Sequence, residues 1–249
     1  MKGGAGHMPC NSTGGGANMS AGQNGAVVLH GGEDDPELTD SVHDYFLPDS
    51  VRSKLPEIEN IKSYSQFEEW LSAQGIELDT MIGKLKGEKR DDEIASVRDD
   101  MQKLAVAIET YKAIYGENAM SKLKKVVLGD EGLDTQASYF YNTIGENDPD
   151  AGTIKIRSIG NSGRVVFHEL AHALQDSMAK NGEDAVGFAN RMHKKTGAPG
   201  LGAYAGASSA VINAEEMADA LAFGFALGHK KGLEYISKLK AAITEGGSK

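Results

Sequence analysis

The sequence predicts an α+β protein in which helices surround a small sheet. Apolar residues recur at helical spacing before residue 120 and again after residue 163, whereas residues 123–160 hold three short runs of β-branched and aromatic residues. Gly, Asp, Asn and Pro separate these runs, as turn residues separate strands. With 249 residues, of which 40% are hydrophobic, the chain is long enough to bury a core.

The first of the expected parts, residues 1–40, is rich in Gly, Asn and Ser and then acidic. Such a segment has little apolar surface to bury, so we expect a flexible tail. It holds Cys10, the only cysteine, which excludes an intramolecular disulfide.

Residues 41–120 are expected to form a helical segment. A short helix is predicted to begin at Ser65, which stands three residues before Glu68 as in a capping box, and to end near Gly75. A long helix should follow and stop at Gly116. Its apolar stripe consists of Ile94, Val97, Met101, Leu104, Ile108 and Tyr111 or Tyr115.

Residues 121–249 are expected to form one further domain, which begins with the sheet. Strands are predicted at 123–130, 137–142 and 152–159. In the last of them Ile154 and Ile156 alternate with polar residues, so we predict a half-exposed strand at an edge of the sheet. Helical patterns then occupy 164–180, 183–195, 213–228 and 232–243, with a Gly/Ala-rich loop at 196–209.

The charge and hydropathy of the chain limit its partners. A net charge of -10 and a pI near 5.2 argue against nucleic acid or an anionic membrane as the main partner, because phosphate binding needs clustered Lys and Arg. No stretch approaches the roughly 20 apolar residues of a membrane span, and no apolar core of signal-peptide length is seen. We therefore expect a cytoplasmic protein, or one packaged inside a phage-like particle. The sequence does not define its oligomeric state.

The predicted helix at 164–180 carries the pattern His-Glu-x-x-His. His168 and His172 are four residues apart, so both imidazoles face the same side of a helix and can bind one metal ion. Glu169 is rotated by about 100° and can take a proton from metal-bound water without binding the metal. The alternative is a buried core helix whose histidines only bond to backbone groups.

A catalytic zinc site of this type needs one further ligand and leaves a position for water. Gln175 and Met178 exclude the zinc motif that has Gly and His at these two positions. His193 is a candidate by residue type, but it stands at a charged helix end that suits the helix dipole. The remaining candidates are the neighbouring Glu215 and Glu216.

The motifs HELAH (168–172) and EEMAD (215–219) together resemble the gluzincin metallopeptidases. The spacing of the two motifs is most similar to the lethal-factor-like branch, which also occurs in phage head-associated proteins. The resemblance covers about residues 123–228. It implies that Glu215 binds one Zn²⁺ ion, that Asp219 supports a zinc-bound histidine, and that Tyr204 stabilises the oxyanion, although Tyr204 also fits a packing role in its loop.

The resemblance also implies a zincin-like fold, with a small mixed sheet over the active-site helix and an edge strand that binds extended peptide. It implies a zinc endopeptidase acting on a peptide or protein substrate, with Glu169 as general base. The alternative is a catalytically inactive zinc-binding domain of a phage or secreted particle. The intact Glu169 favours the enzyme, because a structural zinc site needs no such acid.

The residues themselves also favour Glu215 over Glu216 as the ligand. Asn213 is a good N-cap, and Glu216 three residues later can return to it as in a capping box. Glu215 then shares a helix face with Asp219. A helix beginning near residue 208 would remove the capping reason. Cys10 is interpreted as an inert thiol, and the alternative is that its thiolate occupies the open zinc position.

Overall fold

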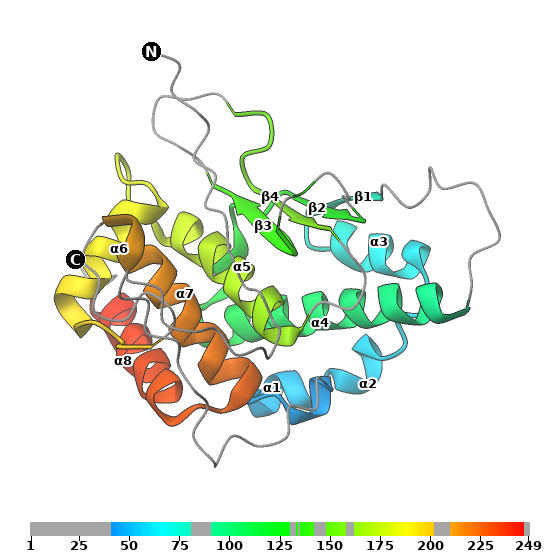
Figure 1. Ribbon diagram of the computed structural model, residues 1–249, viewed down its shortest axis with the longest axis horizontal. Coiled ribbons are helices and arrows are strands. Elements are labelled where there is room, and N and C mark those ends of the chain that lie inside the picture. The colour runs from blue at the N-terminus through cyan, green and yellow to red at the C-terminus, as the bar shows by residue number, and fades with distance from the viewer. Residues whose placement is uncertain are drawn as a thin grey trace, which may run out of the picture.

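The computed structural model of the protein describes residues 41–80, 91–129, 133, 135–141, 148–157, 162–201 and 210–246. In these residues, eight α-helices and a four-stranded mixed sheet confirm the predicted α+β class (Figure 1). The predicted tail with Cys10, and Tyr204 in the loop before the last helices, lie outside the described residues. Within the described ranges, no helix is long and apolar enough to cross a membrane.

The N-terminal segment begins with short helices, one of which has a serine N-cap. A 3-10 turn at Val42–Asp44 is followed by α1 (Asp49–Arg52), α2 (Leu55–Ile58) and α3 (Tyr64–Ser72). Ser63 is the N-cap of α3, because its hydroxyl accepts from Gln66 N, and the Gln66 side chain accepts from Lys62 N. The predicted N-cap at Ser65 is therefore wrong by two residues, since the pattern Ser63-x-x-Gln66 precedes Ser65-x-x-Glu68 and caps the helix instead.

The sheet contains one strand that the sequence pattern does not reveal. β1 (Glu77–Thr80), β2 (Lys125–Leu128), β3 (Ala137–Phe140) and β4 (Thr153–Ile156) have the order β1-β2-β4-β3. β1 and β4 lie parallel to β2, whereas β3 pairs with β4 in the antiparallel sense. β4 is thus an inner strand, and its predicted place at the edge is wrong. β1 and β3 are the edge strands.

A long helix links the N-terminal segment to the rest of the molecule. α4 (Asp91–Tyr115) ends, as predicted, at Gly116, whose φ of 96° favours glycine. Tyr111 of α4 is buried and donates from its hydroxyl to the carbonyl of Phe167, 2.7 Å away. Buried residues from 42 to 242 belong to one continuous core. The helical segment before residue 120 and the rest of the chain therefore share this core.

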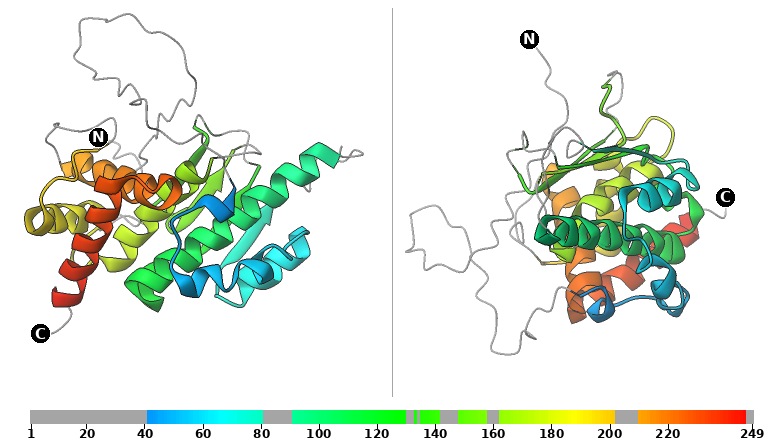
Figure 2. Two further views of the ribbon diagram at one scale, coloured as in Figure 1. Left: turned by 90° about the horizontal axis from the view of Figure 1, so that it is seen from below. Right: turned by 90° about the vertical axis from the view of Figure 1, so that its right-hand side faces the viewer.

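Four helices complete the fold on one side of the sheet (Figure 2). They are α5 (Gly163–Met178), α6 (Ala185–Thr196), α7 (Ala210–Leu227) and α8 (Lys230–Gly246). Ser162 caps α5 and Asp184 caps α6 through their side-chain oxygens. α7 begins before Asn213, so the predicted N-cap at Asn213 is wrong. Asn213 instead donates from its side chain to Asn190 on α6.

The contact of α7 with α8 depends on two glycines. A Cβ on Gly224 of α7 would lie 2.9 Å from the carbonyl carbon of Gly232, and a Cβ on Gly232 would lie 2.6 Å from Gly224 N. Real Cβ atoms do not approach other atoms so closely, so the two helix backbones touch at this point. The position of α7 relative to α8 is therefore fixed by backbone contact.

Candidate metal centre

The helix α5 buries both of its histidines. Apolar residues surround them on almost every side of the helix, and His168 and His172 are only 8% and 2% exposed. Because the two residues are one turn apart, their rings lie side by side, with centroids 5.0 Å apart. The two imidazoles are thus held together in an environment from which water is largely excluded.

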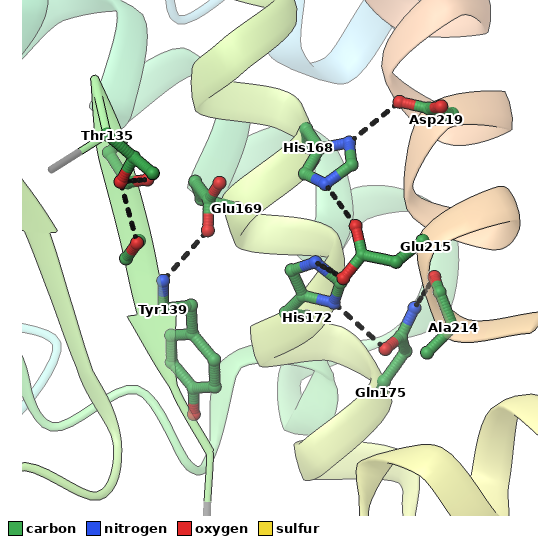
Figure 3. A network of polar contacts seen from close by, with 11 residues as sticks. Thr135, Tyr139, His168, Glu169, His172, Gln175, Ala214, Glu215 and Asp219 are labelled. Carbon is green, nitrogen blue, oxygen red and sulfur yellow. Dashed lines mark hydrogen bonds and ion pairs between the residues drawn. The ribbon is translucent and has the colours of Figure 1, made fainter. Parts of the chain in front are cut away.

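The neighbouring helix α7 adds a carboxylate between the two rings (Figure 3). Glu215 Oε2 lies 3.3 Å from His168 Nε2, and Glu215 Oε1 lies 3.6 Å from His172 Nε2. One ligand atom from each of these three buried residues falls within 4.8 Å of the others. His168, His172 and Glu215, together termed the metal cluster, could therefore hold a metal ion.

The surroundings of the metal cluster fit a cation. The buried Nε2 atom of His172 makes no hydrogen bond to the residues that the structure describes. Its nearby polar neighbour is the carboxylate of Glu215, which is 3% exposed. Removal of a carboxylate from water costs several kcal/mol unless an opposite charge compensates. A bound cation would supply this charge and would also give Nε2 a partner.

Each imidazole is also held through its Nδ1 atom, which contacts an oxygen of a neighbouring side chain. Asp219 Oδ1 lies 3.0 Å from His168 Nδ1, and Gln175 Oε1 lies 3.1 Å from His172 Nδ1. A carboxylate oxygen or an amide oxygen only accepts, so each ring carries its hydrogen on Nδ1 and directs the Nε2 lone pair to the metal cluster. The structure thus brings Asp219 to His168, and it adds Gln175, which the sequence reasoning missed.

Glu169 faces the opposite way, toward the edge strand β3. Its Oε2 accepts a hydrogen bond of 2.8 Å from Tyr139 N, and the residue is 1% exposed. Tyr139 also donates from its hydroxyl to Asp176, 2.9 Å away on the same helix. Burial, together with the Asp176 carboxylate, holds the pKa of Tyr139 well above its usual value. Glu169 is not part of the metal cluster but lies one residue from it on the strand side (Figure 3).

The other candidate ligands lie away from the metal cluster. Glu216 is 1% exposed and accepts a hydrogen bond from Gly200 N at 3.0 Å, so its predicted capping role is wrong. Burial raises the pKa of Glu216. His193 stands in the last turn of α6, where its carbonyl accepts from Gly197 N. The described residues therefore offer Glu215, and not Glu216 or His193, to the two histidines.

Comparisons with protein families, with curated proteins and with solved structures found no match for this chain. A function for the protein must accordingly be inferred from the two sequence motifs and from the geometry of the metal cluster and Glu169.

Proposed function

We propose that the protein is a zinc-dependent endopeptidase of the gluzincin type. The observation that supports it most is the buried metal cluster beside Glu169. Zn²⁺ accepts His nitrogen and carboxylate oxygen at about 2.0–2.2 Å, and tetrahedral ligands at that range stand roughly 3.3–3.6 Å apart. The distances from Glu215 to the two Nε2 atoms, 3.3 and 3.6 Å, are close to this separation. Two imidazoles and one carboxylate also leave the fourth position to water.

The proposed reaction divides the chemistry between the metal and Glu169. Zinc in the cluster would lower the pKa of a water molecule and polarise a peptide carbonyl. Glu169 takes the proton of the attacking water and passes it to the leaving amine nitrogen. Its hydrogen bond from Tyr139 N holds one oxygen of the carboxylate in place.

The edge strand β3 is the proposed binding strand for an extended peptide. Gly152 N and Arg157 N of the β4 side donate to Phe140 O and Gln136 O, so Ala137 and Tyr139 direct their backbone groups away from β4. Two of these outward groups already have partners: Tyr139 N donates to Glu169, and Ala137 O accepts from the Thr135 hydroxyl. A substrate strand would replace these bonds or pair with the remaining outward groups. A substrate that adds itself as a further strand would thus run beside the base.

The second candidate is a zinc-binding domain without turnover, such as a structural part of a phage or secreted particle. The buried metal cluster favours it as much as it favours an enzyme. Glu169 separates the two, because a structural zinc site has no use for a buried acid held next to it by a strand. The likeness of the two motifs to gluzincins, including phage head-associated members, supports zinc in both cases.

Metal analysis and cleavage-site profiling test the proposal together. The full chain is purified, its bound metal is measured, and a mixed peptide library is incubated with the wild type and with Glu169→Gln. We expect about one zinc per chain in both proteins. Hydrolysis should fall by about 10²–10⁴-fold in Glu169→Gln, because a general base contributes that much. Zinc without hydrolysis in the wild type would favour the inactive domain, and no zinc would reject both candidates.

A further inference from the structure

Gln175 is a buried amide that connects the two helices of the metal cluster. It is 0% exposed, and it lies three residues after His172 on α5, hence on the same face. Its Oε1 is 3.1 Å from His172 Nδ1, and its Nε2 donates to the carbonyl of Ala214 on α7 at 2.8 Å (Figure 3). Both ends of the amide are therefore bonded, as a buried polar side chain requires.

The two bonds fix the direction of the amide and, through it, the tautomer of His172. Only the NH₂ group can bond to the carbonyl of Ala214, so the oxygen must face the imidazole. That oxygen accepts and cannot donate, which places the hydrogen of His172 on Nδ1. The lone pair on Nε2 is then directed toward Glu215, 3.6 Å away.

The second bond of Gln175 ends one residue before the carboxylate ligand. Ala214 precedes Glu215 on α7, so its carbonyl belongs to the turn that presents the carboxylate. His168 is joined to α7 in a different way, directly through the charged Asp219. Each imidazole thus has its own connection to α7, one through a carboxylate and the other through a neutral amide.

We propose that Gln175 is a positioning residue of the metal centre: it selects the metal-binding tautomer of His172 and holds the turn of α7 that carries Glu215. The inference rests on the proposed metal-binding function. It separates two tasks within one side chain, because the oxygen serves the histidine and the nitrogen serves α7.

Two variants separate these tasks. Gln175→Met keeps the length of the side chain and removes both bonds, whereas Gln175→Glu keeps an acceptor for His172 and loses the donor to Ala214. The matched control is Gln102→Met, because Gln102 on α4 also donates from its side-chain amide to backbone carbonyls, those of Glu59 and Ile61. Thermal unfolding of each variant verifies that it is folded.

The first measurement is zinc affinity, by competition with a chelator. We expect Gln175→Met to bind zinc about 10–100-fold more weakly than the wild type, the usual loss when a partner of a ligand histidine is removed. Gln175→Glu should lose less, and Gln102→Met should bind as the wild type does. Equal affinity of the wild type and Gln175→Met would overturn the inference while the proposed function stands. No zinc in the wild type would overturn both.

The second measurement needs no metal. Nitrogen-15 NMR of the metal-free protein reports which ring nitrogen of His172 carries the hydrogen. We expect Nδ1–H in the wild type and in Gln175→Glu, and a mixture of the two tautomers in Gln175→Met. An unchanged tautomer in Gln175→Met, or the same mixture in Gln175→Glu, would overturn the assignment of the oxygen to His172.

Discussion

The two sides of α5 hold their functional side chains in different ways. On the side of α7, His168 and His172 meet carboxylate and amide side chains. On the side of β3, Glu169 is held by a backbone N–H of the strand. The histidines thus have side-chain acceptors on α5 and α7, whereas the acid has a backbone donor on the strand. The proposed binding of a metal and the proposed transfer of protons are therefore separable by mutation, one side at a time.

The largest effect is expected on the α7 side, at Glu215. Glu215→Ala removes the only carboxylate of the metal cluster and should abolish stoichiometric zinc binding together with hydrolysis, because two imidazoles alone hold zinc weakly. Metal content after dialysis and the rate of peptide hydrolysis measure the two losses.

The matched control is Glu216→Gln, which keeps an oxygen acceptor for Gly200 N and lies outside the metal cluster. It should keep its zinc. Zinc loss in Glu216→Gln combined with zinc retention in Glu215→Ala would reverse the assignment of the ligand.

A smaller effect on zinc affinity is expected from Asp219, which contacts Nδ1 of His168. Asp219→Ala removes the acceptor of His168 Nδ1 and leaves all three residues of the metal cluster intact. Zinc affinity should fall by about 10–100-fold, as for other partners of ligand histidines. A chelator competition assay measures the loss. Affinity within twofold of the wild type would show that His168 keeps its orientation without Asp219.

The smallest effect on the metal is expected from the β3 side. Tyr139→Phe removes the hydrogen bond to Asp176 and keeps the backbone N–H that holds Glu169. The free energy of unfolding should fall by about 1.5–3 kcal/mol, the usual contribution of a hydrogen bond to a charged group. Zinc affinity should not change, and hydrolysis should decrease because β3 holds the base less firmly. Denaturant unfolding, chelator competition and peptide cleavage give these three values.

Tyr111→Phe is the control for this variant. It removes a hydroxyl that also bonds to α5, at the carbonyl of Phe167, but from the side of α4 and not from β3. It should lower stability without a matching decrease in hydrolysis. If both variants lost hydrolysis equally, Tyr139 would have no particular connection to the base.

Local sequence patterns were sufficient to predict the helices whose buried apolar residues form a regular stripe. The stripe of α4 and the dense apolar run around His168 predict their helices, since each carries enough apolar spacing to define a period. β1 escaped the prediction because Leu78 is the only large apolar residue in it, so no alternation is visible. Its place follows from parallel pairing with β2, which is a contact distant in sequence.

The errors have a common physical origin. The alternation of Ile154 and Ile156 with Lys155 indicates that one face of β4 is buried. It does not indicate whether β4 has a neighbouring strand on both sides. Likewise, Asn213 has the chemistry of a cap, but α7 begins at Ala210 and the Asn213 side chain donates to Asn190 on α6. At the site, the spacing of His168, His172 and Glu215 was readable. Gln175 was missed although its i+3 spacing from His172 and its polarity in an apolar helix were visible.

The glycine contact between α7 and α8 connects the proposed metal centre to a second helix interface. Gly224 follows Glu215 by nine residues, which at about 100° per residue places it half a turn away, on the opposite face of α7. Any side chain there, or on Gly232, would push α7 away from α8 and toward α5. A harmful substitution at this centre therefore need not touch a ligand or its partners. It can arise at Gly224 or Gly232, where the backbones of α7 and α8 touch.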